Sequence, residues 1–148
     1  MIPGPGLAAR GRERGSMSVF VVIFSMTVFL LAGLLVDGGA AINARLKAAD
    51  IAEQGARAAA DEIDVDTLRA TGQVRLLRDD DAVCGRARRI VVAQRADDAR
   101  MTGCVPAATR VTVRVSVHWD AIFLAALGFP GDDMTGSASA GPDVGDGR

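Results

Sequence analysis

The hydrophobic positions of the chain begin with one long uncharged run near the N-terminus. No residue from Gly15 to Val36 carries a charge, and most side chains in this run are large and apolar. As an α-helix with a rise of 1.5 Å per residue, the run would be about 33 Å long, against about 30 Å for the hydrocarbon core of a bilayer. The pattern therefore predicts a transmembrane helix over residues 16–36.

A second apolar pattern follows the run and has helical spacing. Residues 40–64 are mostly good helix formers, and apolar side chains recur there at steps of three or four. We expect the helix to continue as a stem over residues 37–63, with Gly38 and Gly39 as the place where it can bend. The apolar positions form one stripe of mostly small side chains: Ile42, Leu46, Ala49, Ala52, Ala56, Ala59 and Ile63.

This alanine-rich stripe has two interpretations that the sequence does not separate. Small side chains let another helix approach closely, so the stripe can be a packing seam for the helices of neighbouring subunits. It can equally rest on the protein's own small domain. On the opposite face Glu53 and Arg57 lie four residues apart, which is the spacing of a solvated salt bridge.

The distal part of the chain contains one clear strand pattern. From Thr109 to Trp119 large apolar and polar residues alternate, with the valines and Trp119 on one side, which predicts a strand with one buried face. Alternating small residues from Thr135 to Gly141 predict a second strand that pairs back. The composition of residues 82–103 favours a helix. The short apolar segment 120–128 is expected on the membrane or beneath the sheet.

Together these patterns predict an α+β protein. Its long N-terminal transmembrane and stem helix is followed by a small domain with one or two helices and a β-hairpin, over residues 64–141. We expect residues 1–15 to form a leader, and the glycine- and aspartate-rich residues 142–148 to form a disordered tail.

The charges around the run predict its orientation. Arg10, Arg12 and Arg14 precede the run against a single acidic residue, whereas Asp37 is the first charge after it. The positive-inside rule then predicts a single-pass protein of the cell membrane, with a cytoplasmic N-terminus and an extracytoplasmic C-terminal domain. Two alternatives remain: a buried core helix, and a cleaved signal peptide, whose apolar region is normally shorter than this run.

The overall charge and the basic residues argue against nucleic acid as a partner. The chain has 17 basic and 18 acidic residues, so its net charge of -1 produces no general attraction for polyanions. Arg86, Arg88 and Arg89 form a small basic cluster, but no aromatic residues are interleaved with them. We interpret the cluster as a solvated face and predict no nucleic-acid partner.

The sequence contains no recognisable catalytic constellation. His118 is the only histidine and falls on the polar side of the predicted strand, so we interpret it as a surface residue. The aspartates at 79–81 lack the alternation of a calcium loop and fit a helix N-terminus instead. No phosphate-binding loop or closely spaced cysteine pair is present. We therefore predict no enzymatic activity, cofactor, metal or small-molecule substrate.

The two cysteines of the chain, Cys84 and Cys104, suggest a covalent link within the domain. If the domain lies outside the cytoplasm, the compartment is oxidising and a pair of thiols tends to close. We predict one disulfide, which could contribute about 3 kcal/mol to a small core in the chain-entropy model.

Several short motifs resemble a known family. Arg14-Gly15-Ser16 opens the apolar run, Val36-Asp37-Gly38-Gly39 closes it, and Ala48-Ala49-Asp50-Ile51-Ala52-Glu53 follows. In this respect residues 14–63, and less closely residues 109–141, resemble the TadE/TadG-like proteins of tight-adherence (Flp, type IVc) pilus systems. The resemblance implies a minor pseudopilin whose partners are membrane lipid and other pilin-like subunits or the pilus assembly platform.

The resemblance also implies cleavage by a prepilin peptidase between Gly15 and Ser16. The usual type IV prepilin has Glu at the fifth mature position, whereas this chain has Phe20. An uncut, anchored protein is therefore the alternative. The predicted function is a non-enzymatic minor pilin-like subunit in assembly of a tight-adherence pilus or secretion system. The alternative function is a membrane-tethered extracytoplasmic binding or sensing domain unrelated to pili.

Overall fold

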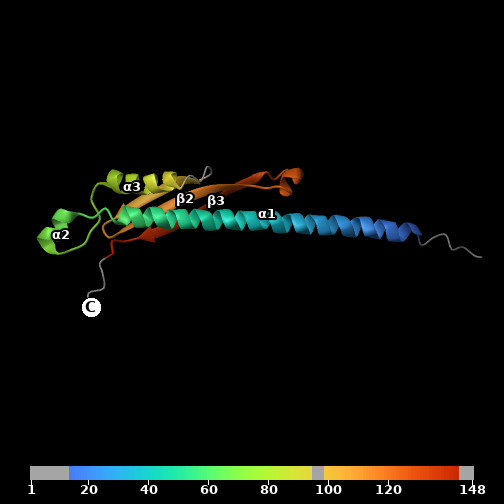
Figure 1. Ribbon diagram of the computed structural model, residues 1–148, viewed down its shortest axis with the longest axis horizontal. Coiled ribbons are helices and arrows are strands. Elements are labelled where there is room, and N and C mark those ends of the chain that lie inside the picture. Colours follow the sequence, from blue (N-terminus) through green and yellow to red (C-terminus); the bar gives the residue numbers. More distant parts are fainter. Residues whose placement is uncertain (1–13, 95–98, 144–148) are drawn as a thin grey trace, which may run out of the picture.

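The computed structural model describes residues 14–94 and 99–143, with side chains from residue 17 onward, as one long helix beside a small domain (Figure 1). The fold class is α+β, as predicted. The elements in chain order are α1 (Arg14–Ala60), α2 (Val65–Thr71), α3 (Asp80–Ala93), β1 (Ala99–Ala107), β2 (Arg110–Asp120), the 3₁₀ helix η1 (Leu124–Leu127) and β3 (Gly131–Ala140).

Helix α1 is a single element of 47 residues that joins the apolar run to the predicted stem. It passes Gly38 and Gly39 without interruption, and Figure 1 shows α1 as a straight helix. Of the described helices, α1 is the one long and apolar enough to cross a membrane. Its large side chains from Met17 to Val36 are exposed, and this half of the helix projects beyond the domain.

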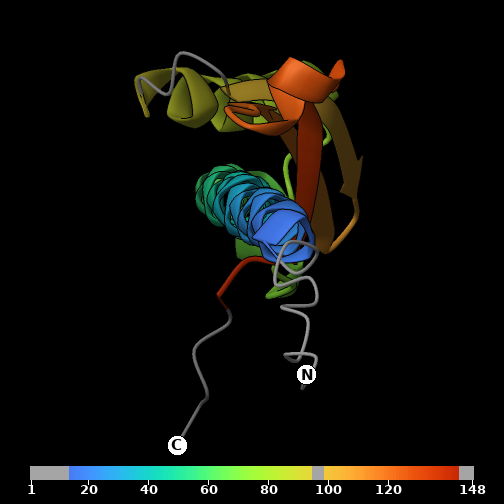
Figure 2. The same ribbon diagram turned by 90° about the vertical axis from the view of Figure 1, so that its right-hand side faces the viewer.

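The domain is a layer of two helices against one sheet. The strands are antiparallel in the order β1-β2-β3, and the predicted hairpin corresponds to β2 and β3. The views in Figures 1 and 2 place α1 and α3 side by side over the sheet. The predicted buried face of β2 is confirmed, because four alternating valines are buried there: Val111, Val113, Val115 and Val117.

Strand β1 was not expected from the sequence. Residues 82–103 were predicted to be helical, but α3 ends at Ala93 and β1 begins at Ala99. This part of the prediction is wrong because pairing with the free edge of β2 satisfies the backbone of a segment that contains Thr102, Gly103 and a proline. The register shifts between Met101 and Gly103, and the sheet therefore has three strands.

Two aspartates determine where the short helices begin. Asp64 accepts a hydrogen bond from the Thr67 amide at the start of α2, and Asp79 accepts one from the Ala82 amide at the start of α3. The Thr67 hydroxyl and amide hold the pKa of the Asp64 carboxyl below its ordinary value. The aspartates at 79–81 thus occupy the N-terminus of a helix, as the sequence suggests.

Small residues bring α1 against the sheet. The buried apolar side chains of the helix are almost all alanine, and they are Ala44, Ala48, Ile51, Ala52, Ala56, Ala59 and Ala60. A Cβ added to Gly136 of β3 would overlap the backbone of Ala48 and Ala49. The strand therefore crosses the helix at backbone distance, and the stem and the distal residues share one core.

We expect Gly136→Ala to destabilise the protein by about 1–3 kcal/mol, because the added methyl has no space between β3 and α1. The matched control is Gly85→Ala in α3, where nothing lies within 4 Å of the new Cβ and the change should stabilise the helix by up to about 1 kcal/mol. Urea unfolding in detergent, followed by circular dichroism, measures both. Equal stability of the two variants would contradict the close approach.

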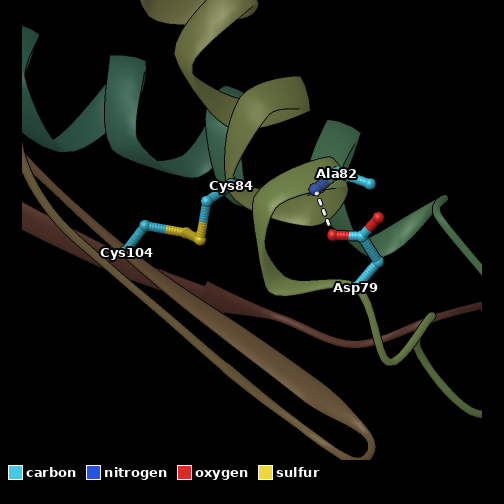
Figure 3. The surroundings of a disulfide bond; sticks show 4 residues. All are labelled: Asp79, Ala82, Cys84 and Cys104. Carbon is cyan, nitrogen blue, oxygen red and sulfur yellow. Dashed lines mark hydrogen bonds between the residues drawn. A yellow bond between two sulfur atoms is a disulfide. The ribbon is translucent and has the colours of Figure 1, made fainter.

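The predicted disulfide is confirmed. Cys84 of α3 is bonded to Cys104 of β1, with their Cα atoms 5.9 Å apart (Figure 3). The bond closes a sequence separation of 20 residues and ties the helix layer to the strand at one edge of the sheet.

Replacing both cysteines by alanine should lower the free energy of unfolding by about 3 kcal/mol, because the unfolded chain then regains the entropy of an open loop. Thermal unfolding with and without a reducing agent measures the effect. Reductant should destabilise the parent chain and leave the double variant unchanged. A double variant as stable as the oxidised parent would rule out this stabilisation.

Candidate functional site at the helix–domain junction

A buried carboxylate joins α1 to the far end of the sheet. Asp37 directly follows the apolar run and is only 1% exposed. Its Oδ1 accepts a hydrogen bond from the Ile122 amide at 2.9 Å. Its Oδ2 accepts bonds from the amides of Phe123 at 3.0 Å and Leu124 at 2.6 Å. One side chain therefore connects segments that lie 85 or more residues apart in the sequence.

The partners of Asp37 are the backbone amides at the start of η1, which have no acceptor within that helix. The residue before this 3₁₀ helix, Phe123, provides no side-chain cap of its own. The first amides of a helix lack partners within the helix and favour a negative charge. Asp37 thus caps η1 from another element.

The charge on Asp37 is favoured by these contacts. Burial opposes ionisation, but the backbone amides of Leu124, Ile122 and Phe123 outweigh it and hold the pKa of the carboxyl below its ordinary value of 3.8. Asp37 is therefore ionised at neutral pH and accepts all three hydrogen bonds as a carboxylate.

A glycine one turn earlier completes the junction. Gly33 is buried, and a Cβ placed there would lie 2.8 Å from the Cβ of Phe123 and 2.9 Å from its Cγ. The Phe123 side chain therefore packs directly on the helix backbone. Gly33 and Asp37 are four residues apart and lie on the same face of α1.

The roles of both residues were not predicted from the sequence. Asp37 was noted as the first charge after the run and as part of a family motif, and Gly33 was given no role. The available signal was an acidic residue directly after the apolar run, combined with a segment at 121–128 in which no side chain can cap a helix. The structure places that segment beside α1, in contact with Asp37, and not beneath the sheet. Its expected position on the membrane stays a prediction.

The predicted helix-packing stripe is divided in the structure. Ala52, Ala56 and Ala59 are fully buried in the protein's own core, and Ala49 and Ile63 are half-buried. Ile42 and Leu46 are 63% and 58% exposed. The division arises because the face of α1 that meets the sheet includes Ala44 and Ala48, and is turned away from these two side chains. A contact of Ile42 and Leu46 with other subunits remains a prediction.

The other predicted residues lie away from the junction. Gly15 and Ser16 are at the start of α1, and the predicted leader and tail lie largely outside the described residues. His118 is on the exposed face of the sheet, where its Nδ1 lies 2.8 Å from Asp133 and its Nε2 lies 3.5 Å from Asp120. Hydrogen bonding to His118 holds the pKa of the Asp133 carboxyl below its ordinary value, and the charge of Arg100 adds to the effect.

No candidate metal site was found within the described ranges, where no group of three or more His, Cys, Asp or Glu side chains is arranged to hold an ion.

The comparison with protein families identifies the class of the N-terminal part. Residues 15–62 match the family described as "Putative Flp pilus-assembly TadE/G-like". The match covers about a third of the chain and nearly all of α1, including Gly33 and Asp37. The resemblance inferred for residues 14–63 is thereby confirmed. No curated protein and no solved structure matches the chain.

The match supports a role related to Flp pili, because this is the process that the family description names. By its length and apolar composition, the N-terminal helix is suited to be a single-pass membrane anchor. The family is one of pilus-assembly components, and its description names no catalytic activity.

We expect Asp37→Asn to loosen η1 from the helix, because an amide offers one acceptor oxygen where the carboxylate offers two. Hydrogen exchange at the amides of Ile122, Phe123 and Leu124 should accelerate about tenfold or more. Asp50→Asn is the matched control, since Asp50 is an exposed carboxylate on the same helix. Unchanged exchange at all three amides in Asp37→Asn would show that the junction does not depend on the charge.

Proposed function

We propose that this chain is a non-enzymatic, minor pilin-like subunit that helps to assemble a tight-adherence pilus or a related secretion system. The observation that carries the proposal is that α1 is one continuous helix with a bare apolar half, firmly attached to a small disulfide-bonded domain. The family match over this helix supports the same process.

The exposed surface of α1 is suited to helix–helix contacts. Its own domain leaves most of its apolar half exposed. Helices in a membrane associate by packing and by interhelical hydrogen bonds. Beyond the run, Ile42 and Leu46 lie four residues apart and continue this apolar surface. We propose that these two side chains contact another pilin-like subunit or the assembly platform.

The proposed orientation has residues 1–15 in the cytoplasm and the domain outside it. The three arginines before the apolar run support it through the positive-inside rule. The Cys84–Cys104 disulfide supports it independently, because such bonds persist in oxidising compartments.

We propose two forms of the subunit: one cleaved between Gly15 and Ser16, and one left uncut. A cleaved chain begins at Ser16 and retains the predicted transmembrane helix over residues 16–36, whereas an uncut chain is anchored by the same helix. Mass spectrometry of the N-terminus in native membranes distinguishes them. Both forms leave α1 free to pack with other helices.

The proposal is tested with single cysteines at Ile42 or Leu46. The native cysteines are paired, so each variant carries one new thiol. We expect a thiol crosslinker in native membranes to join these variants to a second pilin-like subunit or to a platform protein. Lys47→Cys is the matched control, because Lys47 is exposed but turned about 100° around the helix from Leu46.

Crosslinks several times stronger for Leu46→Cys than for Lys47→Cys would support the proposal. Exclusively monomeric protein, or equal labelling from both positions, would count against it and favour a membrane-tethered binding domain. Deletion of the gene should also reduce the number of surface pili, and unchanged piliation would contradict a role in assembly.

A further inference from the structure

The turn between β2 and β3 is unusually apolar for an exposed segment. Residues 121–130, which we term the apolar loop, contain no charged residue. Three of its large side chains are largely exposed, Ile122 by 71%, Leu127 by 60% and Phe129 by 67%, and Phe123 is 47% exposed. Turns that face water are usually polar, and a contiguous apolar patch normally marks a contact with a partner or a membrane.

The apolar loop lies beside the apolar run of α1. Between them is a groove of about 270 Å³, lined on the helix side between Met26 and Leu34 and on the loop side between Phe123 and Leu127. Figure 1 shows η1 alongside the helix at the end of the domain that points along the projecting half. The apolar loop therefore shares the environment of the run.

The rise per residue of the helix gives the depth of the groove in the membrane. Along α1, Leu34 lies about 4–5 Å from Asp37, and Met26 lies about 16 Å from it. The run spans a hydrocarbon core of about 30 Å, so the groove extends from near one boundary toward the middle. Where α1 crosses the membrane, the groove and the side chains that line it lie at hydrocarbon depth.

The backbone of the apolar loop is also suited to lipid. An amide without a partner costs several kcal/mol in hydrocarbon, where no water replaces the missing acceptor. The amides of Ile122, Phe123 and Leu124 donate to Asp37. Four more donate within the loop: Ala121 to Pro130, Ala126 to Phe123, Gly128 to Ala125 and Phe129 to Leu124. Pro130 itself has no amide hydrogen.

We infer that the apolar loop is a second membrane-contacting element, immersed in the leaflet nearest the domain, with lipid acyl chains covering its outer side and occupying the groove. The surface is continuous with the lipid-facing side of α1, and its groove is lined by apolar side chains. The inference adds a lipid contact to the proposed function and rests on the part of it that places α1 across a membrane.

Immersion of the apolar loop would attach the domain to the bilayer at two places. Asp37 supplies the link between them, because it is the residue of α1 that satisfies the loop amides. The sheet would then be held in one orientation relative to the membrane surface, with the β2–β3 turn inserted and the Cys84–Cys104 end away from it.

The test uses the full chain in phosphatidylcholine vesicles whose acyl chains carry bromine, a quencher of tryptophan fluorescence. Trp119 is replaced by Phe, and a single tryptophan is introduced as Leu127→Trp or, as a second variant, Phe129→Trp. Phe24→Trp in the apolar run reports whether α1 is inserted. Val105→Trp, exposed on β1, reports a position in water.

We expect brominated lipid to quench the loop variants as strongly as Phe24→Trp and several times more than Val105→Trp. Acrylamide, a quencher in the water phase, should give the opposite order. Quenching of both loop variants by acrylamide would overturn the inference, and so would protection from both quenchers, which would mean that protein covers the groove. If Phe24→Trp escapes the lipid quencher, the anchoring in the proposed function fails as well, and the two failures are thus distinguishable.

Discussion

The ion–amide contact between Asp37 and the start of η1 determines how the helix and the domain are joined. An aspartate that follows an apolar run would ordinarily be solvated, but here it is buried and its charge is satisfied by three backbone amides. Gly33 allows Phe123 to lie against the helix beside it. Without this contact the three amides at the start of η1 would lose their acceptor, because Phe123 provides no side-chain cap.

The rest of the junction depends on small side chains. Alanines on α1 and glycine on β3 bring two backbones together, so that the valines of β2 and the residues of α3 can close over them. Such a core buries little area per residue, and the Cys84–Cys104 bond adds stability that does not depend on buried area. Close packing and the disulfide thus both stabilise a domain that has few aromatic residues to bury.

The features that could be predicted from the sequence are those encoded by neighbouring residues. The uncharged run, its helical continuation and the alternation of β2 are local patterns, and the disulfide followed from the cysteine count and the expected compartment. Strand β1 was missed because its pairing with β2 is tertiary. Helical spacing predicted an apolar stripe from Ile42 to Ile63, but it did not show which residues of the stripe pack against the sheet. The role of Asp37 was hidden because its partners are distant backbone amides, which leave no mark in side-chain patterns.

The absence of a break at Gly38 and Gly39 has a mechanical consequence. The buried face of α1 is part of the domain core, and Asp37 holds the other end of the sheet, so helix and domain form a single lever without a joint between them. A rotation or displacement of the helix therefore moves the sheet with it, because the two share one core and the Asp37 hydrogen bonds. Conversely, a load on the domain reaches the membrane through the same rod.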